Sequence, residues 1–232
     1  MKLDLLKYMS DRLQDETDEY EEAGPVITIS RLYGCPAKII AKNVSDELNM
    51  KAKVKGYNDL NWSYVTKEIM SESAKELEMD PSKIKYVFDY KKKGLVDEIV
   101  AAHSSKYYKS DRAIRKTIAR VIRNMAREGH VIIVGRGGVA ITRDIPRSLH
   151  INLEAPLDWR IVRIAEKYDK SFEEAEKIIV DVDRKRKQFR EYFEGKNTDY
   201  TQFDITFNCM TLSTDEITSI IIRAIEERNL FK

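Results

Sequence analysis

The sequence has only two cysteines, and neither belongs to a metal-binding or redox motif. Cys35 and Cys209 lie far apart in a chain of 232 residues, without a C-x-x-C pair. Reduced thiols of this kind are typical of a cytoplasmic protein. The three histidines, His103, His130 and His150, are dispersed and have no cysteine or carboxylate beside them at metal-ligand spacing. We therefore expect the histidines to be structural, and the sequence predicts no protein ligands for a metal.

The sequence also lacks a long apolar run and an excess of one charge. No apolar stretch approaches the roughly 18 residues that a membrane-spanning helix needs, and the first 23 residues are too charged for a secretory signal. Charged residues make up 34% of the chain, but the net charge is only +2. This balance argues against a nucleic-acid coat and against a disordered chain. We expect a cytoplasmic protein with no membrane partner, and the charge balance disfavours a nucleic-acid partner.

Short apolar segments alternate with amphipathic helices, which predicts an α/β fold. Strands are expected at 26–29, 130–134, 149–153 and 205–209. Helices are expected at 36–48, 111–128 and 214–228. This alternation indicates a parallel sheet covered by helices on both faces. With 42% hydrophobic residues, the chain can bury one sizeable core.

Three segments are expected around this core domain, which spans residues 24–232. Residues 1–23 predict a leader helix, whose apolar face would dock on the body of the protein or on a second subunit in a homodimer. Residues 57–110 predict a largely helical insertion, in which one helix contains Val65, Ile69, Ala74 and Leu77. Residues 166–197 predict a mobile helical lid.

The segment VITISRLYGCPAKIIA, at residues 26–41, has the frame of a phosphate-binding P-loop but lacks its lysine. In a G-x-x-x-x-G-K-[ST] loop, backbone amides cradle phosphates, the lysine reaches the β and γ oxygens, and the hydroxyl holds Mg²⁺. Here Gly34 stands at the second glycine or one place before it, and Ala37 or Lys38 occupies the lysine position. The N-terminus of the following helix still predicts an anion site. A tight turn without a ligand is the alternative.

A second glycine-rich segment, Gly135-Arg136-Gly137-Gly138, directly follows the next core strand. The carboxyl ends of parallel strands meet at one edge of the sheet, so this segment should lie near the Gly34 turn. A guanidinium offers a bidentate fork for phosphate, and glycines let a ligand approach the backbone closely. A loop with a surface arginine is the alternative.

The expected lid carries a dense run of charge, DVDRKRKQFR, at residues 181–190. A lid that closes would bring arginines onto a transferring phosphoryl group and exclude water. Arg160 and Arg163, three residues apart, repeat the pattern just before the lid. For both groups the alternative is a solvated helix face.

Five motifs in this order resemble the cytidylate kinase-like branch of the P-loop nucleoside monophosphate kinases. They are VITISRLYG, GHVIIVGRGG, LHINLEAPLDWRIVRI, the pair Asp183 and Arg186 followed by Phe189, and FDITFN. The resemblance runs from about Val26 to the C-terminus. It implies a P-loop NTPase-type three-layer fold with five parallel strands. It also implies ATP as donor, Mg²⁺ as cofactor and a nucleoside monophosphate of the (d)CMP type as acceptor.

The resemblance also implies roles for individual residues. The implied catalytic residues are Arg136, Arg160, Arg163, Asp183, Arg184 and Arg186. The implied donor-binding residues are Ser30, Arg31, Gly34, Cys35, Ala37, Lys38 and Asn208. The implied acceptor-binding residues are Tyr57, Asp59, Gly135 and Gly137.

The sequence departs from this family at positions that matter for catalysis. Ala37 carries no charge, Ile39 offers no hydroxyl to Mg²⁺, and the strand before Arg136 ends in Val134, where ordinary cytidylate kinases have an aspartate. Phosphoryl transfer depends on positioning and charge stabilisation. Two hypotheses follow: a kinase whose cationic groups are Lys38 and the lid arginines, or a catalytically impaired nucleotide- or phosphate-binding module that acts through lid closure or subunit contacts. RNA binding is a weaker third, since acidic residues interleave the basic ones.

Overall fold

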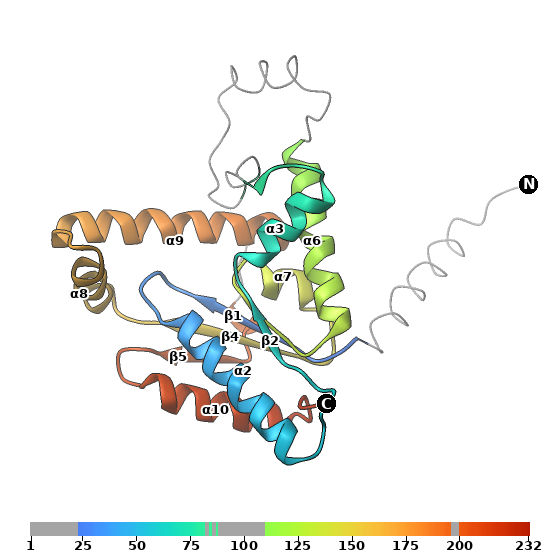
Figure 1. Ribbon diagram of the computed structural model, residues 1–232. Coiled ribbons are helices and arrows are strands. Elements are labelled where there is room, and N and C mark those ends of the chain that lie inside the picture. The colour runs from blue at the N-terminus through green and yellow to red at the C-terminus, as the bar shows by residue number, and fades with distance from the viewer. Residues whose placement is uncertain (1–22, 82–83, 85–86, 88–109, 196–199) are drawn as a thin grey trace, which may run out of the picture.

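The computed structural model in Figure 1 describes residues 23–81, 84, 87, 110–195 and 200–232. The expected leader helix lies outside the described residues except for Ala23, and so does much of the expected insertion at 57–110. No helix in the described ranges is long and apolar enough to cross a membrane.

Five strands form one parallel sheet, which confirms the predicted fold class. They are β1 (Val26–Arg31), β2 (Ser63–Val65), β3 (Val131–Val134), β4 (Ser148–Glu154) and β5 (Ile205–Asn208). The spatial order is β2-β3-β1-β4-β5. The central strand, β1, pairs with β3 on one side and with β4 on the other. Because all the strands are parallel, their carboxyl ends meet at one edge, which is where ligands bind in open α/β sheets.

Helices cover both faces of the sheet, which gives three layers (Figure 1). On one face lie α2 (Ala37–Val54) and α10 (Thr214–Glu227), and on the other lie α6 (Asp111–Glu128) and the short α7 (Gly138–Thr142). A further helix, α3 (Glu68–Glu76), packs on α6. Residues of β1 alternate between the two cores, because side chains of a strand point to opposite faces. Ile27 and Ile29 join the core with α2, whereas Val26 joins the core with α6.

The charged segment that predicts a lid forms two helices, α8 (Leu157–Tyr168) and α9 (Phe172–Glu194). The break between them falls at Asp169, which has a left-handed φ of 51°, and Ser171 then starts α9 with a capping box to Glu174. With 23 residues, α9 is roughly 35 Å long. Phe189 anchors its second half in the core beside α6. The predicted helical character is confirmed, and the predicted mobility stays a prediction. A short helical turn, η1 (Tyr200–Gln202), precedes β5.

The segment at 63–65 corrects a sequence prediction. The apolar spacing predicts Val65 in a helix, but Ser63, Tyr64 and Val65 pair with β3 as the edge strand β2, and α3 starts only at Glu68. A strand of three residues is too short to show the alternation that distinguishes strand from helix. Its carboxyl end delivers Thr66 to the same sheet edge as the Gly34 turn.

A buried histidine of strand β4, His150, predicts how stability depends on pH. Thr28 Oγ1 lies 2.8 Å from His150 Nδ1 and Ser148 Oγ lies 3.1 Å from Nε2. Burial lowers the pKa of His150, with a smaller lowering from Arg228 and an opposing effect of Asp204. The unfolded chain therefore binds a proton at a higher pH than the folded chain does. Stability from this site is present above the unfolded pKa of about 6.5 and falls as the pH falls below it.

We expect the free energy of unfolding to decrease between pH 7 and pH 5.5, above the range in which most carboxylates titrate. The pKa of His130 is also lowered by burial, so His150→Gln should reduce this decrease without abolishing it. Urea denaturation of both proteins across this range measures the slopes. Equal slopes for wild type and variant would contradict the assignment.

Candidate functional site

The turn between β1 and α2 lies at the carboxyl edge of the sheet, at the place the sequence predicts. Gly34 adopts a φ of +99°, which favours glycine. The turn uses its own amides: Tyr33 N donates to Asp183 Oδ1 (2.7 Å), Cys35 N to Leu32 O (3.3 Å) and Ala37 N to Cys35 O (2.9 Å). Pro36 has no amide hydrogen. The turn therefore offers a phosphate fewer backbone donors than its P-loop frame suggests.

Asp183 joins this turn to both lid helices. Its second carboxylate oxygen accepts a hydrogen bond from Arg160 Nη1 at 2.6 Å, and the same nitrogen donates to Tyr33 O at 3.2 Å. Arg160 Nε also donates to Ala155 O at 3.0 Å. The Arg160 and Asp183 side chains are only 8% and 19% exposed. We call Asp183, Arg160 and the Tyr33 backbone the Asp183 clamp.

Two cavities lie beside the turn and share three residues. The larger, about 780 Å³, extends along the Gly34 turn, and the smaller, about 410 Å³, lies between the Gly135–Gly137 loop and α9. Both volumes fall within the roughly 300–1,000 Å³ typical of small-molecule sites. The shared residues are all arginines: Arg31 from the end of β1, Arg136 from the loop after β3, and Arg186 from α9. We call these three the arginine junction.

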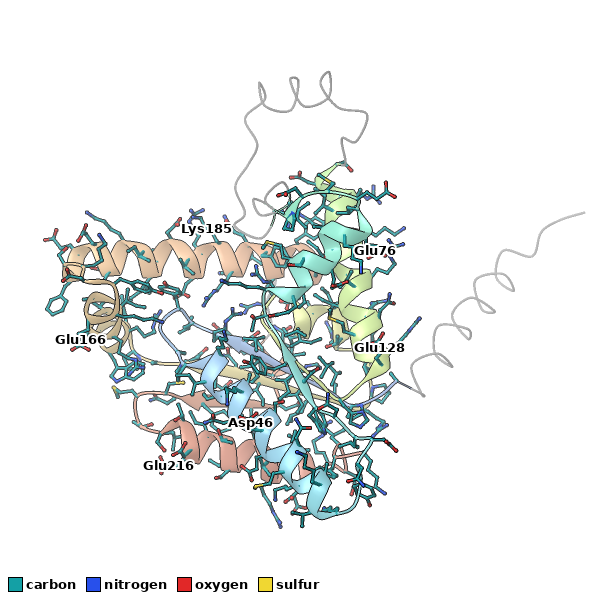
Figure 2. All side chains as sticks on the ribbon, in the orientation of Figure 1. Asp46, Glu76, Glu128, Glu166, Lys185 and Glu216 are labelled. Atoms are coloured by element: carbon teal, nitrogen blue, oxygen red, sulfur yellow. The ribbon has the colours of Figure 1, made fainter. Side chains whose placement is uncertain are left out.

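The cavities are strongly cationic. Around the larger one, Glu166 is the one carboxylate among the described lining residues, and around the smaller one the described lining includes none. Figure 2 labels Glu166 on α8 and Lys185, a lining residue of the smaller cavity, on α9. The cations outside the arginine junction are Lys38, Lys67, Arg163 and Lys167 in the larger cavity, and Lys185 and Arg190 in the smaller. This charge favours an anionic ligand.

The arginine junction is electrostatically unfavourable by itself. Burial lowers the pKa of Arg31, and the charges of Arg186 and Arg136 lower it further. Burial also lowers the pKa of Arg186, with Arg136 adding to the effect and Asp183 opposing it. The Arg186 guanidinium lies 5.3 Å from the centre of the Tyr33 ring. Burial and a hydrogen bond with Tyr168 raise the pKa of Tyr33 to about 12, so the Tyr33 phenol is neutral at physiological pH.

The structure brings most of the candidate residues to the two cavities. Those that line a cavity are Ser30, Arg31, Gly34, Cys35, Ala37, Lys38, Gly135, Arg136, Gly137, Arg163 and Arg186. Arg160 and Asp183 bind each other in the Asp183 clamp and line neither cavity, and the catalytic role expected for them stays a prediction. Arg184 is exposed on α9 and pairs with Asp181 at 2.6 Å. The Asn208 side chain accepts from Met210 N at 3.0 Å and lines neither cavity.

Tyr57 and Asp59, which the sequence places at the acceptor site, line neither of the two cavities, and their acceptor role stays a prediction. They follow the far end of α2, whose 18 residues span roughly 27 Å from the Gly34 turn. The Tyr57 ring lies 6.2 Å from that of Phe231, and Lys232 Nζ lies 4.2 Å from its centre. The aromatic stretch GYNDL thus packs on the C-terminus of the chain rather than on a ligand cavity.

Sequence reasoning missed several lining residues. Thr66 and Lys67 follow β2, which the sequence pattern assigns to a helix, and recognition of that strand would have put them at the sheet edge. The others lie on the turn or on the lid helices, where charge and aromatic content alone do not show which side faces the core: Tyr33, Lys167, Tyr168, Lys185, Phe189 and Arg190.

Cys35 lines the larger cavity but is not suited to nucleophilic chemistry. A hydrogen bond with the Cys209 thiol raises the pKa of Cys35 strongly, and burial raises it further. A thiol is nucleophilic as the thiolate, so Cys35 is a neutral packing group in this cavity.

The side chains at the Gly34 turn do not fit a protein-held Mg²⁺. Ala37, Lys38 and Ile39 carry no oxygen ligand, and β3 ends in Ile133 and Val134. Within the described ranges, no group of three or more His, Cys, Asp and Glu side chains is arranged to hold a metal ion. A triphosphate fits better, because the larger cavity combines the turn with cationic side chains.

The parallel sheet, the strand-to-helix turn and the cationic cavities at its carboxyl edge define an α/β protein of the P-loop NTPase type. Comparison with known proteins narrows this class: the chain belongs to the cytidylate kinase-like family, whose family model matches residues 26–211. A cytidylate kinase from Methanococcus aeolicus is 25% identical over 207 residues, which cover 88% of this chain and 99% of that protein. Family membership supports a nucleoside monophosphate kinase kind of function.

One solved structure supports the fold. A crystal structure of an uncharacterized protein from Eubacterium ventriosum matches with a TM-score of 0.59 and 20% identity, covering 88% of this chain and 98% of the other. A shikimate kinase from Bacteroides thetaiotaomicron matches with a TM-score of 0.47 and 13% identity, covering 87% of this chain and 98% of the other. The second similarity is too low to support an argument about this chain.

The Asp183 clamp predicts that one carboxylate on α9 matters for stability far more than its neighbour. Asp183→Asn leaves the buried Arg160 without its counter-charge and should lower the free energy of unfolding by about 3 kcal/mol. Asp181→Asn, two residues earlier, removes an exposed partner of Arg184 and should cost less than about 1 kcal/mol. Urea denaturation at pH 7 measures both. Equal effects of the two substitutions would contradict the clamp.

Proposed function

We propose that the protein is an ATP-dependent nucleoside monophosphate kinase that transfers a phosphoryl group to a (d)CMP-type acceptor. The observation that carries the proposal is that two cationic cavities meet at the arginine junction. A phosphoryl transfer between two nucleotides needs two such binding sites, with the transferred group between them.

In this proposal the donor occupies the larger cavity along the Gly34 turn, and the acceptor occupies the smaller cavity beside Gly135 and Gly137. An oxygen of the acceptor phosphate forms a bond to the γ-phosphorus of ATP while the bond from that phosphorus to the oxygen of ADP breaks. The protein forms no covalent bond. Arg136 and Arg186 stabilise the charge on the transferring group, which is the main task of the protein in this reaction.

The identity of both nucleotides rests on family resemblance. The (d)CMP-type acceptor is supported by similarity to a protein described as a cytidylate kinase, and ATP is the donor that the resemblance implies. Mg²⁺, when bound, would neutralise phosphate charge. The proposed roles of Arg136 and Arg186 use only the cations of the chain itself.

Turnover of ATP with a panel of nucleoside monophosphates tests the proposal. We expect turnover to be fastest with CMP or dCMP, and Arg186→Ala should reduce kcat by about 10²- to 10³-fold, since it removes a charged donor from the transferring group. Lys187→Ala removes an exposed cation one residue further along α9, where Lys187 faces Glu191 at 3.8 Å, and should leave kcat within about twofold.

Another outcome would identify a different function. Saturable nucleotide binding without turnover of any acceptor would contradict the kinase and favour a nucleotide- or phosphate-binding module. The residues that favour this alternative are Ala37 and Ile39, which replace charged and hydroxyl side chains of an ordinary P-loop.

A further inference from the structure

Arg31 is the last residue of the central strand β1 and lies where the two cavities meet. It lines both cavities, together with Arg136 and Arg186. Arg186 Nη1 donates to Arg31 O at 3.2 Å, so the α9 arginine is held against the Arg31 backbone. Three guanidinium groups from β1, the loop after β3 and α9 therefore meet at one point.

The Arg31 side chain packs directly against the backbone of Gly135. A Cβ atom at Gly135 would lie only 1.6 Å from Arg31 Nη1, and Gly135 has a φ of +72°. No other residue type fits at this position while Arg31 keeps its place. The glycine after β3 thus has a task that its sequence motif does not reveal, which is to leave room for a guanidinium from β1.

No carboxylate of the described residues forms an ion pair with the Arg31 guanidinium. The nearest acidic influence comes from Asp183, but both Asp183 oxygens are engaged, one by Tyr33 N and the other by Arg160. A guanidinium among like charges is costly unless an anion compensates it. An anionic ligand in the cavities would supply this compensating charge.

The Gly34 turn has no cation that lines both cavities, as Arg31 does. Ala37 is apolar and buried, and Lys38 is exposed at the start of α2. Three of the amides of the turn are engaged within the protein. Lys38 lines only the larger cavity, so the charge on a phosphate that lies between the two cavities must come from outside the turn segment 34–38.

We propose that Arg31 binds the phosphate group that lies between the two cavities, and that it supplies from β1 a cation at a place that Lys38, which lines only the larger cavity, does not occupy. The inference rests on the proposed function only in taking a nucleotide polyphosphate as the ligand. A guanidinium can donate two parallel hydrogen bonds to one phosphate, and Arg31 is reached from either cavity.

Thermal stability and phosphate affinity together distinguish a phosphate-binding role of Arg31 from a purely structural one. Removal of Arg31 relieves repulsion from Arg136 and Arg186, so Arg31→Met should melt at the same temperature as wild type or higher when no ligand is present. The same substitution should remove a phosphate contact. A residue that only supports the fold would show the reverse: lower stability and unchanged phosphate affinity.

The experiment uses the full chain and inorganic tripolyphosphate, without divalent metal, in titration calorimetry and thermal melting. Arg31→Met should bind tripolyphosphate about ten- to hundredfold more weakly than wild type, as expected for the loss of a charged hydrogen bond. Arg31→Lys should restore part of the affinity. Arg223→Met, on the exposed face of α10 where Arg223 pairs with Glu227, is the matched control and should bind like wild type.

Gly135→Ala provides a second variant that keeps Arg31 but displaces it. It should weaken tripolyphosphate binding about as much as Arg31→Met does, so the test does not depend on one variant remaining folded. Wild-type affinity in a folded Arg31→Met or Gly135→Ala protein would overturn the proposal. Failure of wild type to bind tripolyphosphate would overturn it as well.

The outcome is separate from that of the kinase assay. Absence of turnover with every acceptor would contradict the proposed function while Arg31-dependent tripolyphosphate binding stood. Normal turnover together with Arg31-independent binding would contradict only the role of Arg31.

Discussion

The ion pair between Asp183 and Arg160 is the interaction that holds the site together. One carboxylate holds the backbone of the Gly34 turn at Tyr33 N and the arginine of α8, and it is itself part of α9. Residues three apart on a helix share a face, so fixing Asp183 also directs Arg186 toward the turn. The arginine junction forms where α9 is held in this way. Asp183 and Arg160 thus support the arrangement of the site through contacts within the protein.

The charge of the site has a structural consequence. An ordinary P-loop provides amides and one lysine, whereas this turn engages three of its amides within the protein and has Ala37 followed by Lys38 where the lysine is expected. The three guanidinium groups come from segments that the fold alone brings together, and burial, with a further effect of the neighbouring arginines, lowers the pKa of Arg31 and of Arg186. Such local destabilisation is common where a protein is arranged for binding rather than for stability. The anion that binds there would compensate it.

Much of the fold follows from sequence patterns, and part of the site does not. Four of the strands and the helices α6 and α10 are long or periodic enough to be recognised, so the parallel sheet and its functional edge could be predicted. The strand Ser63–Val65 is too short for this, so the position of Thr66 and Lys67 at the larger cavity could not be predicted. Charge runs do not reveal which arginine of a helix faces the core, so Arg160, Arg184 and Arg186 looked equivalent although the structure separates them. The distance of Tyr57 from the cavities could not be predicted, because a family motif carries no information on how far α2 extends.

A crystal structure with a dinucleoside polyphosphate, two nucleosides joined by a chain of phosphates, would show whether the arginine junction holds the phosphates between the two cavities. We expect one nucleoside in each cavity and the middle of the phosphate chain in contact with Arg31, Arg136 and Arg186. Phosphates bound only at the N-terminus of α2 beside Lys38, with Arg31 out of contact, would contradict this arrangement.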